Sequence, residues 1–208
     1  LNLRGLVYSR PGYGKSTPRA KDAHWEVDFM HRQAWEVLPA LLSSLQVTRP
    51  WLFGHSDGGS ISLLYASRYA AQCAGAIVVA PHIMVEDISV TSIQLARDAY
   101  LHQGLRERLA RYHDDVDSAF FGWNDIWLSP AFRSWSIEAE LDTIRCPLLA
   151  VQGEDDEYGT LEQVYGIRQR LPQAVVVPIP ECGHSPHRDQ PEMLMNAVSS
   201  FIESLSIN

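Results

Sequence analysis

The sequence lacks the features expected of a membrane-spanning or nucleic-acid-binding protein. Its 208 residues contain no apolar run of eighteen or more, so we expect no membrane-spanning helix and no membrane partner. Lys and Arg number 17 against 25 Asp and Glu, for a net charge of −8, and the acids are scattered. Because binding to phosphate needs a basic face, we also expect no nucleic-acid partner.

Cysteine is scarce as well. The three cysteines, Cys73, Cys146 and Cys182, are an odd number at no metal-ligand spacing, which is typical of reduced thiols in a cytoplasmic protein. No pair of ligands stands at i, i+4 on one helix with a third nearby. We therefore expect no metal and no cofactor. The chain begins at Leu1 with no basic-then-apolar leader, so no secretory signal is visible.

What the sequence does contain is a regular alternation of apolar runs and amphipathic stretches. Strands are predicted at residues 3–8, 51–55, 75–81, 147–151 and 174–179, and helices at 28–45, 60–70, 160–171 and from Pro191 onward. Pro39 predicts a kink or restart near residues 35–38. This order predicts an α/β fold, a mostly parallel sheet with helices on both faces.

The stretch from residue 82 to 145 differs from the rest. It has no strand-like run, but helical patterns at residues 90–101, 105–112 and 116–127 and a crowd of aromatic residues after Phe120. We interpret it as a helical cap over a core formed by residues 1–81 and 146–208. The alternative is a set of ordinary packing helices whose aromatic side chains belong to the core.

The most informative stretch is Gly54-His55-Ser56-Asp57-Gly58, which lies between a predicted strand and a predicted helix. In that context a Gly-x-Ser-x-Gly turn holds its serine in a strained conformation and exposes the hydroxyl beside a helix N-terminus. We expect Gly54 and Gly58 to be required because a Cβ at either would crowd the bent backbone.

Two later strand ends carry the groups that such a serine needs. A cluster of acids at residues 154–157 follows the fourth predicted strand, and a histidine-containing loop at 181–187 follows the fifth. Because chemistry gathers at the carboxyl ends of parallel strands, we expect these groups to meet the serine.

Together these motifs resemble the α/β-hydrolase fold superfamily, in its serine hydrolase branch with a helical cap. Ser56 matches the family's nucleophile, Asp156 the acid of its Gly-x-x-Asp motif, and His184 its Gly-His. The stretch Arg10-Pro11-Gly12-Tyr13-Gly14-Lys15-Ser16 is similar to the family's loop after the fourth strand, although Ser9 occupies the position where the family usually has Asp.

The resemblance implies a catalytic triad. His184 would take the proton of Ser56, Asp156 would hold the imidazole in place, and the backbone N–H of Asp57 would donate to the oxyanion. Loop spacing favours Asp156 over Asp155 as the acid.

Other groups near these motifs have simpler interpretations. His55 is interpreted as structural packing under the turn, and His187 and His82 as surface or loop histidines, although His82 could face the pocket. Cys182 is interpreted as a packed thiol.

One family element is absent from the sequence. The second oxyanion donor of this fold comes from a loop after the third strand, whereas this chain starts at what resembles the fourth strand. The sequence therefore leaves a second donor unassigned and predicts an N-terminally truncated copy of a longer hydrolase.

The predicted function is hydrolysis of a carboxylic ester or related acyl bond of a small apolar or aromatic substrate. Haloalkane dehalogenases and epoxide hydrolases of this fold carry Asp where Ser56 stands, which favours acyl transfer here. A carbon–carbon bond hydrolase of ring-cleavage products, with the same triad, is the alternative. A non-catalytic ligand-binding member of the fold is the alternative from another class. The sequence does not indicate an oligomeric state.

Overall fold

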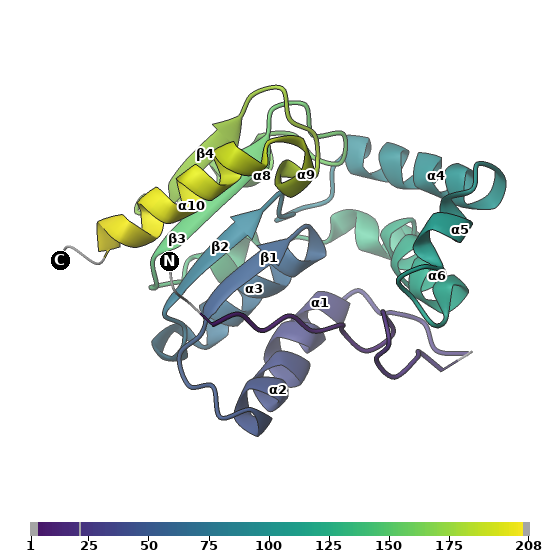
Figure 1. Cartoon of the computed structure of the whole chain (residues 1–208), viewed down its shortest axis with the longest axis horizontal. Helices are drawn as coiled ribbons and strands as arrows, with labels where there is room; N and C mark the ends of the chain where they lie inside the picture. The colour runs from purple at the N-terminus through teal and green to yellow at the C-terminus, as the bar shows by residue number, and fades with distance from the viewer. Residues whose placement is uncertain (1–3, 21, 206–208) are drawn as a thin grey trace.

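The computed structural model describes residues 4–20 and 22–205, and a parallel four-stranded sheet runs through its centre (Figure 1). The strands are β1 (Trp51–His55), β2 (Gly75–Val79), β3 (Leu148–Gly153) and β4 (Val175–Ile179), in spatial order β1-β2-β3-β4. Every residue of β2 and β3 is buried, as expected of central parallel strands covered on both faces. The predicted α/β fold class is confirmed.

Helices connect and cover these strands. Their bounds are α1 (Phe29–Arg32), η1 (Gln33–Val37), α2 (Leu38–Ser44), α3 (Asp57–Arg68), η2 (Ala70–Gln72), α4 (Asp87–His102), α5 (Leu105–Leu109), α6 (Val116–Trp127), η3 (Pro130–Ser134), α7 (Glu138–Leu141), α8 (Glu162–Arg170), α9 (Pro186–Asp189) and α10 (Pro191–Leu205). The short elements η2, η3, α7 and α9 were not predicted. They are too brief to show a periodic apolar pattern.

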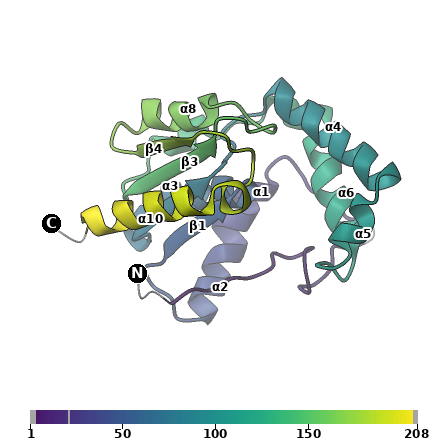
Figure 2. The same ribbon diagram turned by 45° about the horizontal axis from the view of Figure 1, so that its top comes forward.

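The two faces of the sheet carry separate hydrophobic clusters. On one face α10 packs Leu194, Val198 and Phe201 against Ile77 and Leu149 of the central strands. The other face is covered by α1, α2, α3 and α8, whose apolar side chains pack against the alternate strand residues. Figure 2 shows the sheet between α10 and α8. Successive strand residues therefore point into different clusters, as the period of two requires.

The first helical segment is interrupted where Pro39 predicted it. The five residues of η1 are a π-helical turn, and α2 restarts at Leu38 with Pro39 in its first turn. Because proline has no N–H to donate, the preceding hydrogen-bond ladder cannot continue through it unchanged.

The predicted strand at residues 3–8 is wrong for its described part, residues 4–8, and Leu3 lies outside the described residues. Residues 4–8 form no strand and are exposed, with Leu6 and Val7 showing 55% and 96% of their surface. A strand needs a hydrogen-bonded neighbour, and among the described residues β1 pairs only with β2. Apolar composition alone does not supply that neighbour.

Between β2 and β3 the chain forms α4, α5, α6, η3 and α7 and contributes no strand to the sheet. Figures 1 and 2 both show α4, α5 and α6 gathered at one end of the molecule, away from the C-terminal end of α10. Tyr100, Val116 and Phe120 form a small hydrophobic cluster of their own within this group. The assignment of residues 82–145 to a cap stays a prediction.

Candidate active site

The turn after β1 has the strained geometry that its glycines suggested. Ser56 stands between β1 and α3 with φ 55° and ψ −125°, a region that non-glycine residues rarely occupy. Its N–H donates to Val79 O at 2.9 Å, which ties the turn to the neighbouring strand β2. Such strain costs of order 1–3 kcal/mol and persists only where the surrounding structure imposes it.

Only one of the two glycines expected to be required is sterically required. A Cβ on Gly54 would lie 2.1 Å from Gly58 O, whereas a Cβ on Gly58 would meet nothing within 4 Å. The interpretation of Gly58 was wrong because this residue already belongs to α3 and has an open space beside it.

We expect Gly54→Ala to lower the free energy of unfolding by about 3 kcal/mol or more, because backbone atoms of α3 would have to move. Gly58→Ala is the matched control. It should stay within about 1 kcal/mol of wild type, since alanine is favoured over glycine in a helix. Urea unfolding followed by tryptophan fluorescence measures both, and equal losses would contradict this account.

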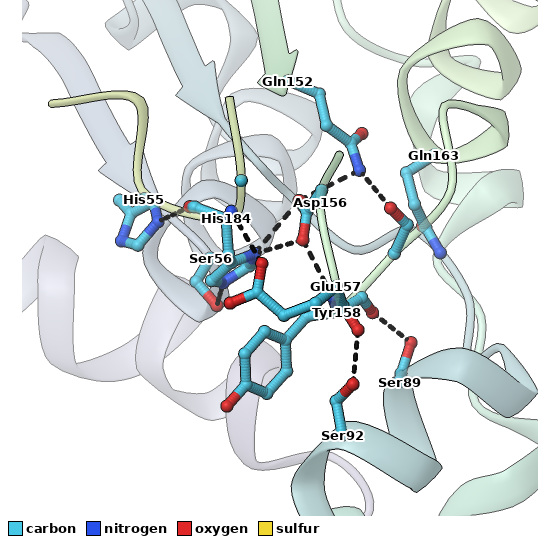
Figure 3. A network of polar contacts seen from close by, with 12 residues as sticks. His55, Ser56, Ser89, Ser92, Gln152, Asp156, Glu157, Tyr158, Gln163 and His184 are labelled. Atoms are coloured by element: carbon cyan, nitrogen blue, oxygen red, sulfur yellow. Dashed lines mark hydrogen bonds and ion pairs between the residues drawn. The ribbon is translucent and has the colours of Figure 1, made fainter. Parts of the chain in front are cut away.

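The structure brings the three predicted triad residues together from three loops (Figure 3). His184 Nε2 lies 3.0 Å from Ser56 Oγ, and His184 Nδ1 lies 2.9 and 3.1 Å from the two oxygens of Asp156. Because a carboxylate can only accept, Nδ1 carries the proton and Nε2 is left free to accept from the Ser56 hydroxyl. The arrangement can therefore take a proton from Ser56.

The choice between the two neighbouring aspartates follows from their surroundings. Asp156 is 6% exposed and accepts hydrogen bonds from Gln152 Nε2 at 3.1 Å and from the Tyr158 N–H at 2.8 Å. Asp155 is exposed, and its backbone N–H donates to Cys182 O. Gln152 and Tyr158 were not singled out from the sequence. Their only signal was proximity to the acid cluster.

His55 holds the histidine loop rather than only packing under the turn. Its Nε2–H donates to His184 O at 2.6 Å, and Glu157 accepts from the His184 N–H at 3.1 Å (Figure 3). Burial lowers the pKa of His55 to about 4, so the ring is neutral at pH 7. Both backbone groups of His184 are thus bonded to side chains.

His82 is the second neutral histidine of this region. It is 3% exposed, and burial together with the neighbouring His184 lowers its pKa to about 3. His82 lies in the loop after β2, but it is not a surface histidine, because its ring is buried in the wall of the site. The other possibility named for it, that it faces the pocket, is correct.

These two histidines predict a pH-dependent stability. In the unfolded chain each histidine binds a proton near pH 6.5. In the folded protein His55 does so only near pH 4 and His82 only near pH 3. Stability is therefore fully present above about pH 6.5 and is lost as the pH falls. As the pH falls from 7.5 to 5.0, we expect each histidine to lower the free energy of unfolding by about 2 kcal/mol. Urea unfolding of His82→Phe should show a correspondingly smaller fall, and an unchanged fall would contradict the assignment.

Asp57 presents both a backbone donor and a buried carboxylate. It opens α3, and among the described residues its N–H has no acceptor, as expected for the first residue of a helix. Its side chain, 6% exposed, accepts from Trp127 Nε1 at 3.2 Å and lies 3.5 Å from Arg10 Nη2. Burial raises the pKa of this carboxyl, and the Arg10 charge acts against that rise. Arg10 and Trp127 thus offset the negative charge beside the free N–H.

A cavity of about 560 Å³ opens over Ser56 and His184. Its walls include Ile93 of α4 and Trp123 and Trp127 of α6, so the helical segment between β2 and β3 contributes to the site. Trp135, by contrast, is 7% exposed and packs against Phe132 in the core. The volume is in the range of small-molecule sites.

The sequence model of the alpha/beta hydrolase family matches residues 1–197. The chain belongs to the alpha/beta hydrolase family. It is 24% identical over 221 residues to "Putative carbamate hydrolase RutD" of Caulobacter sp. (strain K31). The alignment covers 96% of this chain and 81% of that protein. Membership confirms the superfamily that the motifs resemble and supports a hydrolase as the general activity.

Solved structures agree on the fold. A carboxylesterase structure from Nitrososphaera gargenis superposes with a TM-score of 0.74 at 15% identity, over 96% of this chain and 79% of that chain. The structure of an enol-lactonase from Burkholderia xenovorans LB400 gives a TM-score of 0.68 at 19% identity, over 93% of this chain and 78% of that chain. At these identities the likeness shows the fold alone.

The other residues considered from the sequence, His187 and Cys182, make no hydrogen bond to Ser56, His184 or Asp156 side chains among the described residues. His187 is exposed, with its ring 5.0 Å from that of His55. Cys182 is 1% exposed and burial raises the pKa of its thiol to about 11, which is typical of a packed, unreactive cysteine. Within residues 4–20 and 22–205 no three metal-ligating side chains cluster. We assign no second oxyanion donor in this part of the chain. No helix in that same part of the chain is long and apolar enough to cross a membrane.

Proposed function

We propose that this alpha/beta hydrolase cleaves a carboxylic ester or a related acyl bond through an acyl-enzyme on Ser56. The observation that carries the proposal is the continuous chain of hydrogen bonds from Asp156 through His184 to Ser56, of which His184 and Ser56 line the cavity. A serine hydroxyl is a poor nucleophile at neutral pH unless a base lies within hydrogen-bond reach. His184 lies at that distance.

In the proposed reaction His184 Nε2 accepts the Ser56 proton as Oγ attacks the carbonyl carbon. The N–H of Asp57 donates to the oxyanion of the tetrahedral intermediate. His184 then returns the proton to the leaving alkoxide as the carbon–oxygen bond breaks, which leaves an acyl ester on Ser56. A water molecule, deprotonated by His184, attacks that ester, releases the acid and restores Ser56.

We further propose that residues 82–145 act as a cap that shapes the acyl pocket of a small-molecule substrate. Trp123, Trp127 and Ile93 supply the apolar part of the cavity wall, which fits the apolar or aromatic acyl group predicted from the sequence. The likeness to "Putative carbamate hydrolase RutD" adds support, because carbamates and esters share a carbonyl attached to a leaving heteroatom.

Rapid mixing with p-nitrophenyl butanoate tests the proposal. We expect a burst of about one p-nitrophenol per protein, followed by slower turnover, and a butanoyl adduct on the peptide that contains Ser56. Absence of both the burst and the adduct would reject the acyl-enzyme. A dienol-ketone ring-cleavage product belongs in the same assay, since the same triad serves carbon–carbon bond hydrolysis. Binding of such compounds without turnover would instead favour a non-catalytic member of the fold.

A further inference from the structure

The loop after β2 is held by buried polar groups that together position one side chain, His82. The hydroxyl of Ser60, itself 0% exposed, donates to His82 O at 2.6 Å and accepts from the His82 N–H at 3.1 Å. The side chain of Gln163, also fully buried, accepts from the next N–H, that of Ile83, at 2.7 Å. Ala80, two residues earlier, has φ 47°. A positive φ at an alanine costs free energy, so the hydrogen bonds of Ser60 and Gln163 hold this loop against backbone strain.

The imidazole that this loop positions has no protein partner of its own. His82 Nδ1 is buried without a hydrogen bond, and within residues 4–20 and 22–205 neither ring nitrogen is bonded to the protein. Buried polar atoms are normally paired, and an unpaired one destabilises the fold. A phenylalanine or leucine would fill the same wall without that cost, so packing alone does not explain a histidine there.

The ring borders the cavity close to the reacting atoms. Its centroid lies 5.9 Å from that of His184 and 4.9 Å from that of Trp127. His184 Nε2 in turn lies 3.0 Å from Ser56 Oγ, where the scissile carbonyl carbon would bond. Substrate atoms that reach His82 are therefore only a few bonds from that carbon.

We infer that His82 is a substrate-binding residue, which hydrogen-bonds a neutral hydroxyl or keto oxygen on the acyl part of the substrate close to the scissile carbonyl. The inference rests on the proposed acyl-enzyme function and narrows its substrate class from apolar acyl groups to hydroxy- or oxo-acyl groups. His82 Nδ1 is buried, so Nε2 is the nitrogen that can meet the substrate, and on an uncharged ring it donates or accepts one hydrogen bond, which suits a neutral oxygen group. The neutral ring itself supplies no counter-charge for a carboxylate.

The test compares p-nitrophenyl esters of butanoate, 2-hydroxybutanoate, 3-hydroxybutanoate and 3-oxobutanoate. These esters share a leaving group and chain length and differ only in the polar group. We expect the wild-type protein to favour at least one of the three polar esters over butanoate by about tenfold or more in kcat/KM. His82→Phe should lower the ratio of kcat/KM for that ester to kcat/KM for butanoate by about tenfold or more. His82→Gln, which keeps hydrogen-bonding groups, should retain part of the preference.

The outcomes separate the inference from the function it rests on. If no ester gives either a burst or an adduct on Ser56, the acyl-enzyme proposal fails. If butanoate gives a Ser56-dependent burst but the wild type favours none of the polar esters, only the inference about His82 is overturned. Equal losses on all esters in His82→Phe also overturn it, because they would indicate a structural role or a contact with the shared leaving group. A wild type that favours none of the polar esters overturns the inference even if the variant does not fold.

Discussion

Replacing Ser56 with alanine is expected to abolish the burst and to lower kcat/KM for p-nitrophenyl butanoate by at least about 10⁴-fold. The Oγ atom that lies 3.0 Å from His184 Nε2 is the only atom removed, so no acyl group can form on this residue. Residual hydrolysis would come from water activated in the cavity and from binding alone.

The fold of the Ser56→Ala variant should persist, which makes the result interpretable. Ser56 is tied to β2 through its backbone N–H, and alanine keeps that bond. Ser67→Ala is the matched control, because it removes a hydroxyl from α3, the helix that follows Ser56, and that hydroxyl donates to Leu64 O. That variant should keep wild-type kinetics. Normal burst kinetics in Ser56→Ala would exclude Ser56 as the nucleophile.

The second large effect is expected from Asp156→Asn, a loss of about 10⁴-fold in kcat. Asparagine is nearly the same shape, but its amide can donate a hydrogen bond to His184 Nδ1. The histidine would then carry its proton on Nε2, facing Ser56, and could no longer accept the serine proton. A loss of kcat with little change in KM distinguishes this tautomer effect from damage to the pocket.

Asp155→Asn supplies a control that differs by a single position. Asp155 is exposed, so its amide should leave kcat within about twofold of wild type. The pair of variants measures directly which acid of the cluster at residues 154–157 acts with His184. A larger loss in Asp155→Asn than in Asp156→Asn would reverse the assignment.

Local patterns predicted much of the fold because they report local physics. The apolar runs at the four observed strands and the period of the helices reflect burial on one or both faces of an element. Pro39 predicted the interruption that the structure shows as a π-helical turn, since a missing N–H acts on its own helix. The same reasoning failed at residues 4–8, where an apolar run has no strand beside it.

The sequence by itself determined the family, the strained turn at Ser56 and the strand ends that carry an acid and a histidine. These follow from spacing along the chain and from the rule that parallel strands end at one edge of the sheet. Only the tertiary structure decided that Asp156 is buried while Asp155 is exposed, that His55 supports the His184 backbone and that His82 borders the cavity. The reason is physical. Each of these outcomes depends on contacts between residues far apart in the chain, such as His55 and His184, whose residue numbers differ by 129, and no local periodicity encodes them.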